Sequence, residues 1–170
     1  MDIEITDIDG TRAKLRYGTL TFDCALGKAG ITTHKREGDH ATPAGRFPLR
    51  KLYFRPDRLT QPPCALPITE IETLDGWCDA PDHALYNQYV RLPFDASHEQ
   101  LWRTDELYDL VVVLGYNDDP VVPSAGSCIF MHVARDGYSP TEGCVALEKG
   151  DLLELLAAIG KESFINIPQS

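Results

Sequence analysis

The sequence lacks several features that would assign it to a large class of proteins. Its 170 residues contain no run of about 18 apolar residues, so no membrane-spanning helix is predicted. The first residues have neither the basic start nor the apolar stretch of a signal peptide, so they predict no export signal. Basic residues are few, with 16 Lys or Arg against 26 Asp or Glu and a formal net charge of −10. A polyanionic partner such as nucleic acid is therefore not expected.

The spacing of the cysteines resembles no disulfide framework. The five cysteines are an odd number and include no Cys-x-x-Cys pair, so at least one free thiol is expected within the chain. Hydrophobic residues make up 43% and charged residues 25%, as in ordinary globular proteins. No internal repeat or linker divides the sequence, and we therefore predict one domain over residues 1–170.

Alternation of apolar and polar residues predicts β-strands in the first third of the chain. Asp9-Gly10 supplies a hairpin turn between the first two strands, which favours an antiparallel sheet with one solvated face. A glycine-rich loop is expected after the third strand, over residues 27–45. The predicted strands are residues 3–5, 13–17, 20–24 and 46–54.

Residues 55–109 differ from the rest because six prolines interrupt them and many aromatic residues lie between. Irregular chain of this length inside a compact domain is uncommon and often forms a lid or a binding wall. We predict a lid-like insertion or substrate wall here, with a plain structural insertion as the alternative and a short helix at 97–107.

Regular structure is predicted again from residue 110. Residues 110–114 are apolar throughout, as in a buried central strand, and 128–133, 144–147 and 164–167 are further strands. A helix is expected over 151–159, with Asp151 as its cap, Glu154 completing a capping box and Gly160 ending it. The expected fold is mostly β, with one C-terminal α-helix.

The residues with the clearest chemistry are His132 and Cys144. A strand delivers His132 to its end, and a polar loop then returns to a strand at Cys144, so the ring and the thiol can meet. An imidazolium beside a thiol lowers the thiol pKa, and the imidazole can later protonate a leaving amine. Gly143 permits unusual backbone angles, and the N–H groups of Gly143 and Cys144 are candidate oxyanion donors.

Three other interpretations of these residues are open from spacing alone. An isolated cysteine is commonly a small buried apolar residue, and a lone histidine is commonly a satisfied polar group. A zinc site from Cys128, His132 and Cys144 lacks closely spaced ligands and a fourth partner, so no metal is predicted. A papain-like peptidase places its cysteine before its histidine, which is the reverse of the order here.

The stretch resembles the active-site motif of the YkuD-type L,D-transpeptidases, in which a strand-end His precedes Ser/Thr-x-Gly-Cys. Those elements are His132 and Thr141-Glu-Gly-Cys144 in this sequence. Ala41-Thr-Pro-Ala-Gly-Arg-Phe47 is similar to a second family element, and Gly115-Tyr-Asn-Asp118 is similar to a proteobacterial subgroup.

The resemblance implies a β-sandwich or barrel-like catalytic domain that works through an acyl-enzyme on Cys144, with His132 oriented by a backbone carbonyl. It implies cross-linking of peptidoglycan stem peptides with a diaminopimelate amine as acceptor, without metal or cofactor. It also implies a periplasmic or cell-envelope location and a covalent carbapenem adduct at Cys144. Hydrolysis of peptidoglycan amides on the same scaffold, or a non-catalytic peptidoglycan-binding module, are the alternatives.

The chain departs from the common family pattern on both sides of its cysteine. Glu142 replaces a His, and no Arg follows Cys144 to hold a substrate carboxylate. The pattern therefore leaves the linkage open between two diaminopimelates or from L-Ala to diaminopimelate. Substrate binding is instead predicted to fall to Arg46, Tyr116, Asn117 and Thr141.

Overall fold

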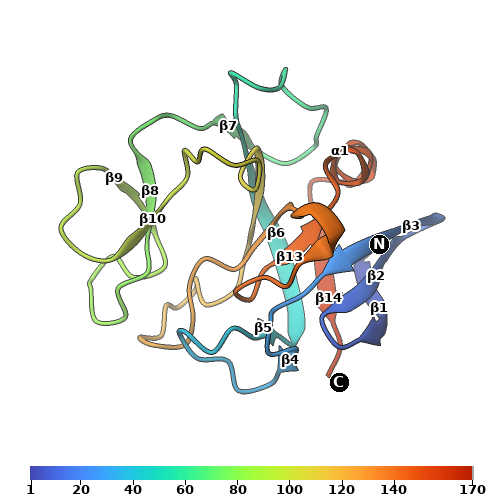
Figure 1. The fold of residues 1–170 in the computed structure, drawn as a ribbon, viewed down its shortest axis with the longest axis horizontal. Helices are drawn as coiled ribbons and strands as arrows, with labels where there is room; N and C mark the ends of the chain where they lie inside the picture. Colours follow the sequence, from blue (N-terminus) through green and yellow to red (C-terminus); the bar gives the residue numbers. More distant parts are fainter. Residues whose placement is uncertain (170) are drawn as a thin grey trace.

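The computed structural model describes residues 1–169, and most of the strands close into a barrel-like sheet (Figure 1). Long strand β6 closes it by pairing with β14 through its first half and with β11 along its second half. In spatial order the sheet is β11 (Leu110–Leu114), β12 (Phe130–Val133), β13 (Val145–Leu147), β3 (Leu20–Ala25), β2 (Arg12–Tyr17), β1 (Ile3–Asp9), β14 (Phe164–Ile167), β6 (Gly45–Phe54) and β7 (Ile68–Glu70). The mostly-β, barrel-like prediction is confirmed.

The predicted strands of the first third are present. Strands β1, β2 and β3 pair antiparallel in sequence, and the first turn is Gly10-Thr11, one residue later than the predicted Asp9-Gly10, because Asp9 still pairs with Arg12. Two very short strands, β4 (Ile31–Thr32) and β5 (Thr42–Pro43), pair parallel within the predicted loop.

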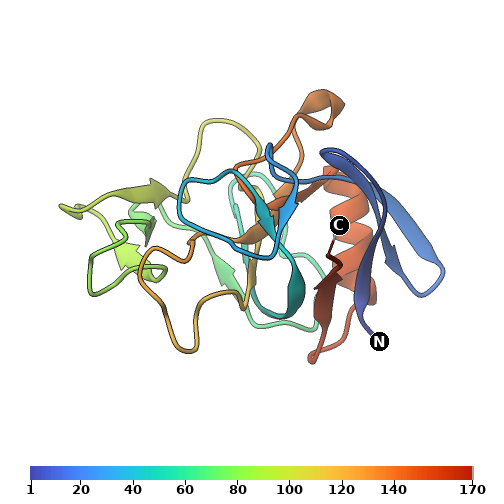
Figure 2. The same ribbon diagram turned by 90° about the horizontal axis from the view of Figure 1, so that it is seen from below.

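The insertion carries a small sheet of its own, which stands to one side of the barrel in both ribbon views (Figures 1 and 2). Its order is β10 (His98–Gln100), β8 (Asp75–Cys78) and β9 (Tyr89–Arg91). The helix predicted over 97–107 is wrong, because β10 pairs with β8 from His98 to Gln100 and turns follow it. Pairing with a distant strand overrides the weak local preference of a short segment.

The two faces of the barrel wall have different neighbours. Leu110, Val112 and Leu114 point into the barrel core, whereas Val111 and Val113 point outward. This burial on both faces explains why β11 is apolar throughout. The insertion covers the outer face with apolar side chains that include Ile71, Trp77, Leu101 and Tyr108.

Helix α1 (Lys149–Ala158) begins earlier than predicted and has a different cap. The Glu148 side chain accepts hydrogen bonds from the N–H groups of Gly150 and Asp151, so the capping role predicted for Asp151 is wrong. Strand β14 then pairs parallel with β1 and returns the chain to its beginning. In the described residues, no helix has the length and apolar character needed to cross a bilayer.

Candidate active site

Strands β12 and β13 place His132 and Cys144 on the same face of the barrel wall. The strands are parallel, and His132 pairs with Ala146. Paired residues of neighbouring strands point to the same side, and so do residues two apart along a strand. Cys144 precedes Ala146 by two residues, so its side chain shares the outer face with His132. This shared face accounts for the sequence prediction that the two side chains come together at neighbouring strands.

Both side chains line one cavity of about 350 Å³. The barrel supplies one wall through β12 and the loop from Ser139 to Cys144, and the insertion supplies the facing wall through Asp79, Glu99 and residues 103–108. The short 3₁₀ helix Asp136–Tyr138 follows β12 just before that loop. The cavity is therefore built by segments that lie far apart in the sequence.

Thr141 organises the loop before the nucleophile. Its backbone exchanges hydrogen bonds with Leu26 and Lys28, at 2.9 and 2.8 Å. Its Oγ1 donates to the Cys144 carbonyl at 2.7 Å and accepts from Gly143 N–H at 3.1 Å. Gly143 N–H is thus occupied in this structure and is not the free oxyanion donor that the sequence predicts. Thr141 does line the cavity, although its hydroxyl is engaged by its own loop.

The Cys144 thiol is almost completely buried, with 6% of the residue exposed. Its Sγ donates to the Cys128 carbonyl at 3.1 Å and accepts from Phe130 N–H at 3.5 Å. Burial is the main cause that raises the pKa of the Cys144 thiol, to about 12, and the negative charge of Glu99 is the second cause. The Cys144 thiol is therefore protonated in this structure.

His132 is equally enclosed and packs edge-to-face against the Tyr108 ring, with centroids 5.5 Å apart. Burial lowers the pKa of His132 to about 4, and the positive charges of Arg103 and Arg135 act in the same direction. Nδ1 lies 2.9 Å from the Val133 carbonyl oxygen, which can only accept, so Nδ1 carries the proton. Nε2 is then the unprotonated nitrogen.

The resting pair is thus a neutral imidazole and a neutral thiol. The imidazolium that the sequence analysis expected beside the thiol does not fit this enclosed site, because burial disfavours both charges. A neutral Nε2 is nevertheless the form that accepts a proton from a thiol. Within residues 1–169, no group of three or more His, Cys, Asp or Glu side chains is arranged to hold a metal ion.

Three of the four predicted substrate-binding residues lie outside the cavity. Arg46 forms a bidentate ion pair with Asp2, at 2.6 and 3.0 Å, and stacks on Phe164 at the β6–β14 pairing. Tyr116 packs against Phe47. Asn117 bridges its own loop by bonding Val122 and Gly126, so it shapes the chain before β12. The structure therefore does not bring Arg46, Tyr116 or Asn117 to the cavity, and each side chain is engaged elsewhere.

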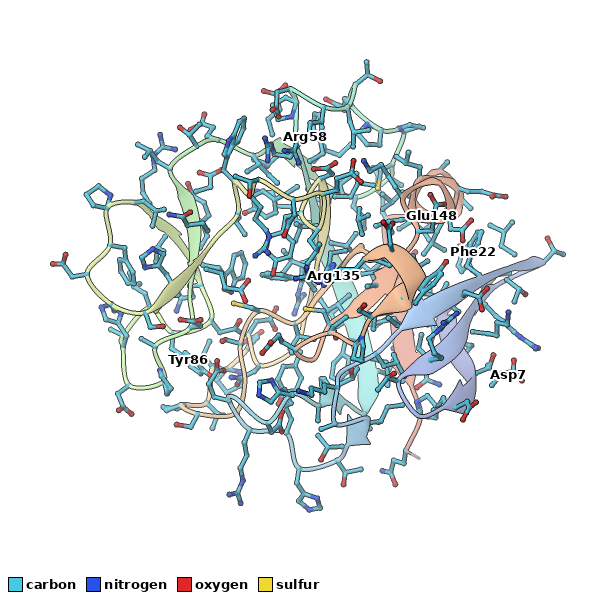
Figure 3. All side chains as sticks on the ribbon, viewed as in Figure 1. Asp7, Phe22, Arg58, Tyr86, Arg135 and Glu148 are labelled. Carbon is cyan, nitrogen blue, oxygen red and sulfur yellow. The ribbon has the colours of Figure 1, made fainter. Side chains whose placement is uncertain are left out.

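Sequence reasoning missed the charged residues of the insertion and one arginine after β12. Glu99, Arg103 and Arg135 line the cavity together with the predicted pair. Figure 3 labels Arg135 near the middle of the view, between the insertion and the strands around β13. No local pattern marks these residues, because only the tertiary fold brings them to the thiol. Glu142, which replaces the usual His, is exposed and lies 2.8 Å from His40 Nδ1.

Asn87 of the insertion anchors the segment that holds the nucleophile. Its Oδ1 accepts from Trp77 Nε1 and from Cys128 N–H, both at 3.1 Å. Its Nδ2 donates to the carbonyls of Tyr116 and Asn117, at 3.0 and 2.8 Å. Cys128, the residue whose N–H Asn87 holds, also presents the carbonyl that accepts a hydrogen bond from the Cys144 thiol. We therefore expect Asn87 to position the nucleophile without touching it.

Replacing Asn87 with alanine should lower the free energy of unfolding by about 2–3 kcal/mol, because several buried polar groups lose their partner. Acylation of Cys144 should also slow by about tenfold, since the Cys128 peptide is no longer fixed. Urea titration and single-turnover labelling measure the two effects. Gln88→Ala, at the exposed next residue, is the matched control. Equal acylation rates in Asn87→Ala and the wild type would remove the positioning role.

A closed barrel with a cysteine and a histidine on one face of neighbouring strands, in one cavity, has the form of a cysteine-dependent catalytic domain. Residues 5–167 match the family model of the YkuD L,D-transpeptidase catalytic domain. The chain therefore belongs to this family, whose chemistry is directed at peptidoglycan. Neither a curated protein nor a solved structure matches the chain.

Proposed function

We propose that the protein is an L,D-transpeptidase that cross-links peptidoglycan stem peptides through an acyl-enzyme on Cys144. The observation that carries the proposal is the placement of Cys144 and His132 in one cavity within a chain of this family. A protonated thiol beside a neutral imidazole suits a nucleophile that is activated only when a substrate is bound. The acceptor in this proposal is the side-chain amine of a diaminopimelate residue.

In the proposed first half-reaction, one proton moves from the Cys144 thiol to His132 and then from His132 to the leaving amine. As Cys144 Sγ attacks the carbonyl carbon at the L-centre, Nε2 of His132 takes the thiol proton and a C–S bond forms. The C–N bond then breaks, and Nε2 returns the proton to the leaving amine. Val133 holds the ring throughout by accepting from Nδ1–H. Cys144 N–H is the proposed oxyanion donor, since Thr141 occupies Gly143 N–H.

The second half-reaction resolves the thioester. The acceptor amine attacks the acyl carbon, the C–S bond breaks, and Nε2 passes a proton from the amine to the sulfur. Water in place of the amine would give hydrolysis on the same residues. Because the family's substrate is the cell wall, we propose a periplasmic or cell-envelope location.

Intact-protein mass spectrometry tests the nucleophile. The wild type should gain the mass of one carbapenem, and Cys144→Ala should gain none. Cys64→Ala is the matched control, because Cys64 is the most exposed of the five cysteines and lies outside the cavity. An adduct that persists in Cys144→Ala, or none in the wild type, would contradict the assignment.

Incubation with purified muropeptides tests the reaction. Cross-linked dimers, identified by mass, support transfer. Shortened monomers alone indicate hydrolysis, and unchanged muropeptides with the wild type indicate a binding module without catalysis. Fragmentation of the dimers distinguishes a link between two diaminopimelates from a link between L-Ala and diaminopimelate.

A further inference from the structure

Three carboxylates line the cavity without a basic partner. They are Glu37, Asp79 and Glu99, and within residues 1–169 none of them forms a salt bridge with Lys or Arg. Each instead accepts a hydrogen bond from a hydroxyl group, at 2.5 to 2.6 Å, and the three donors are Tyr86, Ser97 and Tyr108. Partly enclosed carboxylates elsewhere in the chain, such as Asp75 and Asp109, do have basic partners. The cavity therefore holds uncompensated negative charge.

Glu99 lines the same cavity as Cys144, and it accepts a hydrogen bond from Tyr108, whose ring packs against His132. Of the charged groups that act on Cys144 and on Cys128, it has the largest effect. Burial raises the pKa of the Glu99 carboxyl, while the hydrogen bond that Tyr108 donates opposes that rise. An incoming cation would remove the cost of this enclosed negative charge.

Basic residues line the same cavity, and they are Lys35, Arg103 and Arg135. Lys35 is paired with Asp39, and Arg103 is paired with Asp105 through two hydrogen bonds of 2.8 and 2.7 Å. Arg135 is exposed, and no carboxylate of residues 1–169 forms a salt bridge with it. The cavity of the Cys–His pair thus holds a carboxylate without a basic partner and a guanidinium without an acidic partner.

We propose that this cavity binds the zwitterionic D-amino-acid end of the acceptor diaminopimelate, with Glu99 receiving the ammonium and Arg135 receiving the carboxylate. The inference rests on the proposed function and names its acceptor site. The two groups of such an end sit on one carbon, so a cavity with one unpaired charge of each sign suits it. Arg135 would then bind the substrate carboxylate in place of the arginine that does not follow Cys144 in this chain.

The site also explains how an amine would be preferred over water. Held at Glu99, the ammonium releases one proton to solvent, and the neutral amine attacks the thioester on Cys144. The new C–N bond forms as the C–S bond breaks, and Nε2 of His132 passes the second amine proton to the sulfur. Water carries no charge for Glu99 to attract, so it gains nothing from the site.

Acceptor kinetics of the full chain test the proposal. Two stem peptides serve as acceptors, one with diaminopimelate and one with lysine, which keeps the amine but lacks the neighbouring carboxylate. Glu99→Gln should raise the acceptor KM about tenfold for both peptides and shift products toward shortened monomers. Arg135→Gln should raise KM about tenfold for the diaminopimelate peptide only.

Glu99→Gln keeps the side-chain oxygen that accepts from Tyr108, so the fold should be retained. Glu72→Gln, an exposed carboxylate of the same insertion outside the cavity, is the matched control and should change neither KM. Acylation is followed separately, as release of the residue beyond the cleaved bond with no acceptor present, so that an effect on the donor half-reaction is distinguished from an effect on the acceptor.

The outcomes separate the two proposals. A wild type that forms no acyl-enzyme overturns both the function and the acceptor site. Normal acylation with an unchanged acceptor KM in Glu99→Gln overturns the acceptor site alone. A large loss of acylation in Glu99→Gln with no acceptor present also overturns it, because the charge would then bind the donor.

Discussion

His132→Gln is expected to slow acylation of Cys144 by about 10³-fold at pH 7. With the thiol pKa raised to about 12, only about one Cys144 in 10⁵ is ionised at that pH without help. A base that takes the proton during attack is therefore required, and we propose Nε2 of His132, which lines the same cavity, for this role. Stopped-flow or quench measurement of carbapenem acylation gives the rate.

The pH dependence of this rate should differ between the two proteins. His132 is neutral above its pKa of about 4, so the wild-type rate should be level from about pH 5 to pH 8. In His132→Gln the rate should rise about tenfold per pH unit, because only hydroxide forms the thiolate below a pKa of about 12. His34→Gln, an exposed histidine outside the cavity, is the control. A wild-type limb near pH 6.5 would show instead that His132 titrates as an exposed imidazole.

Gly143→Ala should slow acylation by about 100-fold and lower the free energy of unfolding by about 2–3 kcal/mol. The residue has φ +137, and an added Cβ would lie 2.8 Å from the Ala41 carbonyl oxygen. Neither the backbone angle nor the contact suits alanine, and the neighbouring atom belongs to main chain that cannot rotate away. The loop must move, and Cys144 is the next residue.

Gly10→Ala separates the two causes of that loss. Gly10 also has a positive φ, +61, but a Cβ there would meet no atom within 4 Å. It should lose about 1 kcal/mol of stability and no activity. Denaturant titration and acylation rates of both variants provide the comparison. If Gly143→Ala acylated as fast as Gly10→Ala, the close approach to Ala41 would have no part in placing the nucleophile.

The strands and the reactive pair follow from local sequence patterns, because alternation and strand-end placement are visible within a few residues. Residues 110–114 are the clearest case, since an unbroken apolar run matches burial on both faces. Structure that depends on contacts between distant parts of the chain is harder to predict from local patterns. The segment near His98 became a strand through pairing with β8, and Glu148 replaced Asp151 as the helix cap one turn earlier.

The chemical environment of the site was the hardest part to predict. The sequence suggests that the Arg46 guanidinium can bind a substrate carboxylate. In the structure it already pairs with the carboxylate of Asp2, which lies near the N-terminus. Asn87 and Glu99 lie about 40 or more residues before Cys144, in a segment with no regular pattern. Their roles depend on how the insertion folds onto the barrel. The same burial disfavours the thiolate–imidazolium pair that a neighbouring thiol and imidazole would suggest.

The origin of the two cavity walls has a consequence for how such proteins diverge. Neighbouring barrel strands fix the spacing of thiol and ring through their own main chain, whereas the small sheet of the insertion brings Asp79 and Glu99. If the proposed acceptor site is correct, changes at Asp79 and Glu99 should alter which stem peptide is accepted, while the main chain of β12 and β13 keeps the spacing of thiol and ring.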